Sequence, residues 1–180
     1  MEHFFCDKYE LGIWELKSDV LFHKIPENKY FEFIDFAWGI GIETAKKYIN
    51  RLSTNVPSEM IEKLGISILE TEKGFSSPEY KIYSEYYSNL KKITLYKKNI
   101  INEFEQLSNK NITDIKDYSR MRELFIAHEI FHHIECHDIG LTLKKKKVVT
   151  FKIGPFKLTS GVRALSEIGA HAFTKEIINL

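Results

Sequence analysis

Cysteine is scarce in this 180-residue chain, which contains only Cys6 and Cys136. Two thiols so far apart in sequence do not make the disulfide framework that holds small secreted proteins together. The first residues, MEHFFCDKYE, also lack a basic segment followed by an unbroken apolar run, so we expect no secretory signal. These absences indicate a reduced, cytoplasmic protein.

Long apolar runs and a strong net charge are absent as well. No window approaches the roughly eighteen uncharged apolar residues that a membrane-spanning helix needs. The formal net charge is only +1, so attraction to nucleic acid or to a membrane would have to come from a local patch. The lysine run at 144–147 could attract an acidic partner, but such runs are typical of solvated loops. We therefore expect no membrane association and no direct binding to nucleic acid.

The composition is that of a globular protein, with 43% apolar and 28% charged residues. At this length the chain can form one domain with a substantial core, and two full domains are not expected. Residues 1–42 are aromatic and irregular in pattern, with a break at Pro26. We interpret 1–42 as an aromatic-rich extension of uncertain structure and 43–180 as the main domain.

Helical and strand patterns alternate through the main domain. Apolar residues at helical spacing predict a helix over 43–52, and a short helix over 58–64 is closed by Gly65. The strongest helix covers 117–135, with Asp117 or Ser119 as its N-cap. The other expected elements are strands at 66–68, 81–87 and 93–96, a hairpin turning at Gly154 and Pro155, and a final helix over 163–180. This order predicts an α+β fold.

The sequence HEIFH, within the strongest helix, points to a metal site. His128 and His132 are four residues apart, so on a helix they share one face and can bind one ion. Zinc suits them because it takes imidazole nitrogens in a tetrahedral site, and a hydrolytic site keeps one position for water. Glu129 follows the first histidine directly, where it can accept the proton of the attacking water without binding the metal.

Two histidines need a third ligand, and three carboxylates are candidates. Asp138 would complete a local pattern, but the chain must then turn sharply at position 135, where glycine is favoured and Glu135 stands. Glu167 fits best, because it lies early in the final helix on one face with His171. Glu176 is the alternative in the same helix.

These residues resemble a known family. HEIFHH followed by EIGAHAFTKEII is similar to the ImmA/IrrE-type metallopeptidase domain, in which an HExxH helix is followed by a helix of the form E-x-E-A-N-x-F-A-x-E-L-L. The resemblance implies a small zincin-like domain, with a twisted, mainly antiparallel sheet packed on the HExxH helix and the glutamate helix. It also implies zinc bound by His128, His132 and Glu167, with Glu129 as the catalytic base.

The family resemblance implies a zinc-dependent endopeptidase that cuts a cytoplasmic protein, such as a transcriptional repressor. An edge strand such as 93–96 would hold the extended substrate by strand addition. The chain departs from the family pattern at Gly169 and His171, which stand in place of Glu and Asn. With the unexplained residues 1–42, these departures motivate an alternative, a non-catalytic protein-interaction module on a zincin scaffold.

The remaining histidines of the HEIFHHIECHD stretch receive separate interpretations. His133 and His137 are rotated away from the metal ligands on a helix, so we expect them on the surface, with Cys136 as a partly buried thiol. A peptidase also needs a group that polarises the attacked carbonyl. The candidates for that role are His171, Arg163 and Tyr118.

Overall fold

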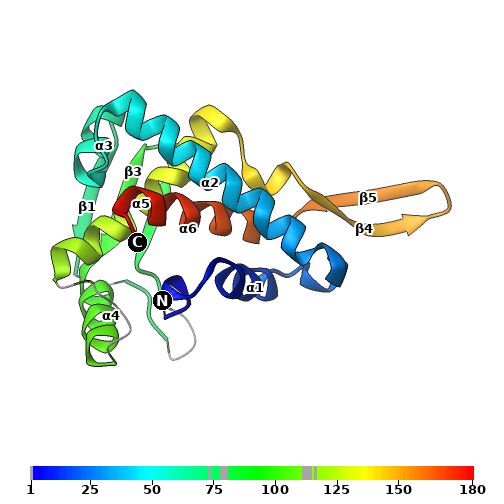
Figure 1. Cartoon of the computed structure of the whole chain (residues 1–180), viewed down its shortest axis with the longest axis horizontal. Helices are drawn as coiled ribbons and strands as arrows, with labels where there is room; N and C mark the ends of the chain where they lie inside the picture. Colours follow the sequence, from blue (N-terminus) through cyan, green and yellow to red (C-terminus); the bar gives the residue numbers. More distant parts are fainter. Residues whose placement is uncertain (1, 73, 78–80, 111–114, 116) are drawn as a thin grey trace.

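The computed structural model describes residues 2–72, 74–77, 81–110, 115 and 117–180 (Figure 1). The described part of the chain is α+β, as expected from the sequence. Its helices are α1 (Lys8–Ser18), α2 (Tyr30–Leu52), α3 (Pro57–Leu64), α4 (Lys97–Asn109), α5 (Tyr118–Ile134) and α6 (Ala164–Ile178). Its strands are β1 (Ser67–Thr71), β2 (Ser84–Tyr87), β3 (Lys92–Tyr96), β4 (Lys147–Ile153) and β5 (Phe156–Gly161).

Helix α2 is longer than the sequence pattern suggested. The helix expected over 43–52 begins at Tyr30, because Phe33, Ile34 and Ala37 extend its buried face toward the N-terminus. The boundary expected after residue 42 therefore lies inside one continuous helix. Helix α2 packs along α6, and α6 packs against α5, so these three helices form the centre of the molecule (Figure 1).

Two helices were not anticipated from the sequence. Helix α1 lies within the region expected to be irregular, and it begins at Asp7, whose side chain accepts hydrogen bonds from the backbone of Tyr9 and Glu10. Helix α4 follows β3 directly and buries Ile100 and Leu107, seven residues apart, on one face. Both helices bury apolar residues in the main core, so 1–42 is part of the packed molecule.

The main sheet has three strands in the order β1–β3–β2. Strand β1 pairs with β3 in parallel, and β2 pairs with β3 antiparallel, so the sheet is mixed rather than mainly antiparallel. The expectation that 93–96 forms an edge strand is wrong, because β3 is the central strand and is largely buried. Strand β2 is the edge strand that lies against α5.

The expected helix ends are confirmed. Helix α3 ends at Gly65, whose φ of 66° is in the left-handed region that glycine adopts without strain. Helix α5 starts after Asp117, whose carboxylate accepts a hydrogen bond from the backbone N–H of Arg120. Asp117 is thus the N-cap of the helix that carries HEIFH, and Ser119 lies inside the helix.

Helices α2 and α6 approach closely at two glycines. A Cβ atom added to Gly41 would lie 2.3 Å from the backbone oxygen of Gly169, and one added to Gly169 would lie 2.7 Å from the ring of Phe131 in α5. Gly169 stands where the family pattern has glutamate, and here a larger side chain would push α6 away from its neighbours. The glycine thus fixes the distance between the two helices that supply the candidate metal ligands.

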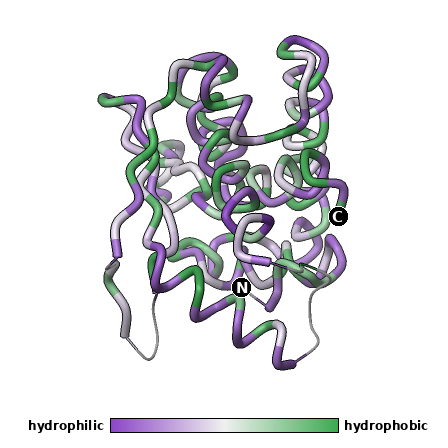
Figure 2. The backbone as a smooth tube through the Cα atoms, turned by 90° about the vertical axis from the view of Figure 1, so that its left-hand side faces the viewer, coloured by the Kyte–Doolittle hydropathy of each residue, from purple (hydrophilic) through white to green (hydrophobic). Residues whose placement is uncertain are grey.

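Strands β4 and β5 form the expected hairpin, which turns at Gly154 and projects from the body of the molecule (Figure 1). Apolar and polar residues alternate along most elements, without one long apolar segment (Figure 2). Among the described residues, no helix combines the length and apolar character needed to cross a membrane.

Candidate metal centre

His128 and His132 lie on one face of α5 and point toward each other. Their Nε2 atoms are 3.2 Å apart, and the ring centroids are 4.9 Å apart. The opposite face of the helix is buried by Ile126 and Ile130, so packing fixes which way the two imidazoles point. The i, i+4 spacing of the sequence motif thus brings both nitrogens to one point in space.

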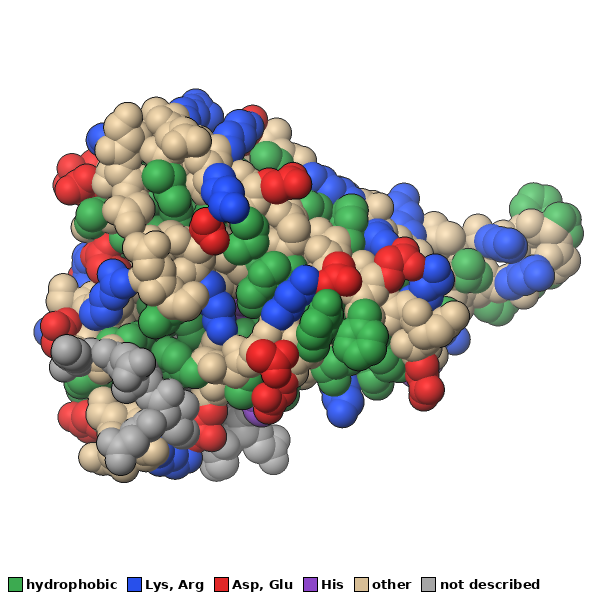
Figure 3. Space-filling view, viewed as in Figure 1, with side chains coloured by type: hydrophobic (Ala, Val, Ile, Leu, Met, Phe, Trp, Pro, Cys, Tyr) green, Lys and Arg blue, Asp and Glu red, His purple; other side chains and the backbone are tan. Residues whose placement is uncertain are grey.

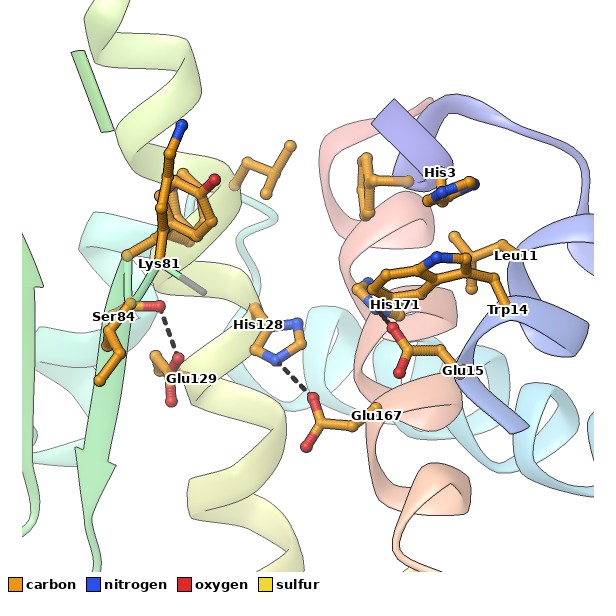
Figure 4. Close-up of a pocket in the computed structure, with 15 residues that line it drawn as sticks. His3, Leu11, Trp14, Glu15, Lys81, Ser84, His128, Glu129, Glu167 and His171 are labelled. Atoms are coloured by element: carbon orange, nitrogen blue, oxygen red, sulfur yellow. Dashed lines mark hydrogen bonds and ion pairs between the residues drawn. The ribbon is translucent and has the colours of Figure 1, made fainter. Parts of the chain in front are cut away.

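Glu167, from the first turn of α6, lies beside His128 (Figure 4) and is also close to His132. Its Oε2 is 3.3 Å from Nε2 of His128, and its Oε1 is 3.7 Å from Nε2 of His132. A tetrahedral zinc ion with bonds of about 2.0–2.1 Å requires its ligand atoms to be about 3.3–3.4 Å apart. The donor atoms therefore fit zinc in both type and spacing, and three protein ligands leave one position for water.

The charges of the three residues favour a metal site. Burial raises the pKa of Glu167, but His132 and His128 together lower it by a larger amount. The pKa of Glu167 is therefore well below its usual range, and the carboxylate is ionised. Burial lowers the pKa of His132, but Glu167 and Glu135 together raise it by a larger amount. The pKa of His132 is therefore well above its usual value. A metal ion must displace that proton, so binding will depend on pH.

Glu135 supports His132 from the other side of the ring. Its Oε2 lies 3.2 Å from Nδ1 of His132, which directs Nε2 toward the other ligands. The carboxylate of Glu135 is 1% exposed and also accepts hydrogen bonds from the backbone N–H of Thr142, at 2.7 Å, and from the hydroxyl of Ser166. These contacts outweigh burial and lower the pKa of Glu135, so a buried negative charge faces the histidine.

The chain leaves the regular helix after Ile134. A single π-helical turn covers Glu135–Ile139, and this turn places Glu135 beneath His132. Asp138 points elsewhere and accepts hydrogen bonds from Lys47 and Tyr48, at 2.9 and 2.8 Å. It is therefore not beside the two histidines.

Glu129 lies next to the three candidate ligands without joining them. Its side chain is 5% exposed, and its Oε1 accepts a hydrogen bond of 2.6 Å from the hydroxyl of Ser84 on β2 (Figure 4). This bond joins the HEIFH helix to the edge strand of the sheet. Both residues line the same cavity as His128 and Glu167.

The cavity beside this centre has a volume of about 240 Å³. One wall comes from the residues before β2 and from α5, and the other comes from the N-terminal segment and α1 (Figure 4). The N-terminal wall is formed by His3, Phe4, Leu11 and Trp14. The aromatic residues of 1–42 thus line the cavity, which stays open beside the ligands.

His171 is next to the centre, and one of its two ring nitrogens has a hydrogen-bond partner. Its Nε2 lies 2.8 Å from a carboxylate oxygen of Glu15 in α1, and its Nδ1 is buried. Burial lowers the pKa of His171 more than Glu15 raises it, so the ring is neutral at neutral pH. The pair therefore links α1 to α6 beside His128. Nε2 is engaged by Glu15, whereas Nδ1 has no hydrogen-bond partner among the described residues and is kept from a substrate carbonyl by its burial.

The other candidates for polarisation and for ligation lie at different distances from the centre. Arg163 is exposed and lines a smaller neighbouring cavity that includes Glu15 and Glu167. Tyr118 starts α5 and is ten residues, or about 15 Å of helix, from His128. Glu176 is near Lys46, at 4.0 Å, and is outside the cluster of candidate ligands.

Two expectations about the neighbouring residues are wrong. His133 is buried rather than on the surface, with its Nδ1 2.7 Å from the hydroxyl of Tyr86 on β2. Cys136 is exposed rather than partly buried. His137 is exposed as expected, and its Nε2 lies 3.0 Å from the same hydroxyl. A face of α5 that points away from the metal ligands can still be covered by the sheet, which the helical wheel does not reveal.

A second group of possible ligands lies near the chain start. His3, Cys6 and Glu10 offer atoms within 4.8 Å of one another. The ring of His3 stacks on Trp14 with centroids 4.8 Å apart. Glu10 is exposed, and among the described residues no buried carboxylate forms a hydrogen bond with His3, so this group is the weaker of the two clusters.

Three contacts around the candidate metal centre had no signal in the sequence. Ser84, Glu135 and Glu15 are polar residues outside any motif, and only the folded chain brings them beside Glu129, His132 and His171.

Comparison with protein-family models, with curated proteins and with solved structures found no match to this chain.

Proposed function

We propose that this chain is a zinc-dependent endopeptidase of the zincin type, similar to ImmA/IrrE-type metallopeptidases. The observation that carries the proposal is the set of three donor atoms from His128, His132 and Glu167, spaced 3.2–3.7 Å apart. When bound, zinc would act as a Lewis acid on the substrate carbonyl and make a water molecule more acidic.

Each remaining residue has a role that follows from its position. Glu129 accepts the proton of the attacking water and returns it to the leaving amine, as a general base and then a general acid. Ser84 holds the carboxylate of Glu129 in one orientation through its 2.6 Å hydrogen bond. Glu135 fixes the ring of His132 so that its Nε2 faces the ligand position.

The proposed substrate is an extended peptide segment of a cytoplasmic protein. Strand β2 is an edge of the sheet and carries Ser84, so a substrate strand added to it would pass beside Glu129. Family resemblance suggests a regulatory protein, such as a transcriptional repressor, as the target. The free thiols of Cys6 and Cys136 are consistent with a reducing compartment.

One observation favours the alternative of a non-catalytic interaction module. Glu129 is almost fully buried and already hydrogen-bonded to Ser84, so a substrate water must compete with that hydroxyl. In the alternative, the cavity binds a partner segment and zinc is structural or absent.

The variant Glu129→Gln separates these functions. It keeps the hydrogen bond to Ser84 and the metal ligands, but it removes the base. A zinc-loaded preparation is incubated with a peptide library, and cleavage is followed by mass spectrometry. The peptidase proposal predicts cleavage by the parent and none by the variant, with equal zinc content. Equal cleavage by the two proteins would show that Glu129 is not the base, and no cleavage by the zinc-loaded parent would favour the interaction module.

A further inference from the structure

The β4–β5 hairpin is anchored only at its base. Val148 and Val162 are buried in the core cluster that includes α6 residues, whereas the strands beyond them project from the body (Figure 1). A two-stranded hairpin on its own is marginally stable in water. Its projecting part therefore presents its side chains to the surroundings rather than to the rest of the chain.

One face of the projecting part is apolar. Phe151 is paired with Leu158, and Ile153 is paired with Phe156 across the two strands. Their exposed fractions are 58%, 64%, 62% and 79% in the same order. Two successive apolar pairs thus lie on one face and reach the tip of the hairpin. Exposed apolar residues clustered in this way mark an interaction site.

The opposite face and the base are basic. Lys152 is directly paired with Lys157, an arrangement of like charges that weakens the hairpin by itself. Residues 142–163 contain seven Lys and Arg and no Asp or Glu, which gives this segment a formal charge of +7. Because the whole chain has a net charge of +1, the rest of the chain has a net charge of −6. Figure 3 shows lysine and apolar side chains together on the hairpin. An anionic surface would relieve the repulsion between the two lysines.

We propose that this hairpin is a docking site for an anionic lipid surface. The two apolar pairs are two residues apart along each strand, which is about 7 Å. This length matches the roughly 5–10 Å to which interfacial apolar side chains enter a bilayer. Lys152 and Lys157 lie between the pairs, and their long side chains extend from that depth to the headgroups. The contact is independent of the metal centre and goes beyond the peptidase proposal.

A lipid surface suits the hairpin better than a folded partner or a nucleic acid. The three cavities described for this part of the chain, beside the metal centre, near Arg163 and near Lys47, include no residue of the projecting part, whose apolar side chains stand out from the surface. The aliphatic residues of the apolar face, Ile153 and Leu158, add nothing to a nucleic-acid contact, whereas burying them in a bilayer interface is favourable. The expectation of no membrane association rested on the lack of a spanning segment, and a surface contact needs none.

The test is co-sedimentation of the full-length chain with lipid vesicles. The parent protein should sediment with vesicles of phosphatidylcholine mixed with phosphatidylglycerol, and far less with phosphatidylcholine alone. Added salt should weaken the binding. The variant Ile153→Ser/Phe156→Ser should bind at least about tenfold more weakly because it loses its apolar contact. The variant Lys152→Gln/Lys157→Gln should lose roughly 30-fold, at about 1 kcal/mol for each lysine.

Matched controls use exposed residues elsewhere. Leu90→Ser removes an apolar side chain of similar exposure from the turn between β2 and β3, and Lys17→Gln/Lys24→Gln removes two exposed lysines from the N-terminal region. Both should bind like the parent. The inference is overturned if the parent does not sediment with anionic vesicles, or if the hairpin variants bind as the controls do. It is also overturned if sedimentation velocity without lipid shows a dimer of the parent that the Ile153→Ser/Phe156→Ser variant does not form.

Discussion

Glu135 and His132 form a hydrogen-bonded pair at the base of the candidate metal centre, with 3.2 Å between Oε2 and Nδ1. The histidine is a candidate ligand, whereas the glutamate contacts no other candidate ligand atom. A buried carboxylate in this position fixes the orientation of the imidazole and raises its basicity. The pair is therefore expected to control metal affinity without taking part in the reaction.

Replacing Glu135 tests this role. Glu135→Gln retains the shape of the side chain but removes its charge, so zinc affinity should fall about 10–100-fold. Competition with a chromophoric chelator measures the change. Glu176→Gln, in α6 but outside the cluster, is the control and should leave the affinity unchanged. Equal affinities for the parent and Glu135→Gln would mean that the carboxylate only holds Thr142 and Ser166.

The Glu15 and His171 pair predicts a different outcome. Glu15→Ala leaves His171 buried without its partner, so the free energy of unfolding should fall by about 1–3 kcal/mol. Zinc content should not change, because neither residue is a candidate ligand. Chemical denaturation and elemental analysis of one preparation measure both. Glu10→Ala, exposed on the same helix, should change stability by less than about 0.5 kcal/mol. Loss of zinc from Glu15→Ala would assign this pair to the metal centre instead.

Two glycines of α2 provide a matched test of helix packing. Gly41→Ala places a methyl group against the backbone of α6 and should cost about 1–3 kcal/mol of stability. Gly39→Ala has open space around it and should stabilise the helix by about 0.5–1 kcal/mol. Thermal or urea unfolding of the two variants beside the parent measures the difference. Similar effects of the two substitutions would contradict the close approach of α2 and α6.

Stability should depend on pH through His133. Burial, with smaller contributions from His137 and Lys91, lowers the pKa of His133 to about 4, against about 6.5 in an unfolded chain. Between these values the unfolded state binds a proton that the folded state does not, so stability falls as the pH is lowered from about 6.5 to about 4. The full loss is about 3 kcal/mol.

The variant His133→Phe isolates this contribution. Urea unfolding of the parent and the variant is measured with a chelator present, so that zinc loss does not contribute at low pH. The parent should lose more stability than the variant between about pH 7 and pH 4. Parallel pH profiles would show that His133 keeps an ordinary pKa.

The sequence predicted the parts of this molecule that depend on local patterns. The helix bearing HEIFH, its Asp117 cap, the Gly65 helix end and the hairpin turn at Gly154 all follow from spacing and turn chemistry, and the structure confirms them. The i, i+4 spacing also predicts that His128 and His132 lie together. Glu167 is the best candidate for the third ligand because it lies early in the final helix, on one face with His171. Such features need few residues and no knowledge of the tertiary fold.

The contacts between distant segments were not predictable in this way. A helix was expected only from residue 43 because the preceding residues show mixed periodicities. Packing of α2 against α6 overrides the low helix propensity of Gly39 and Gly41. Local sequence patterns carry no information about strand order, so the prediction that 93–96 is an edge strand is wrong. The role of Glu135 depends on a π-helical turn and a distant serine, Ser166, that no spacing rule connects.

The measurement that tests the central proposal most directly is the zinc content of the purified chain by elemental mass spectrometry. The parent is measured beside His132→Ala, Glu167→Ala and Cys6→Ser, the last of which disrupts the second group of possible ligands. The account predicts about one zinc ion per chain in the parent and in Cys6→Ser, and almost none in the other two variants. A parent that binds no zinc after reconstitution, or zinc retained by both His132→Ala and Glu167→Ala, would contradict it.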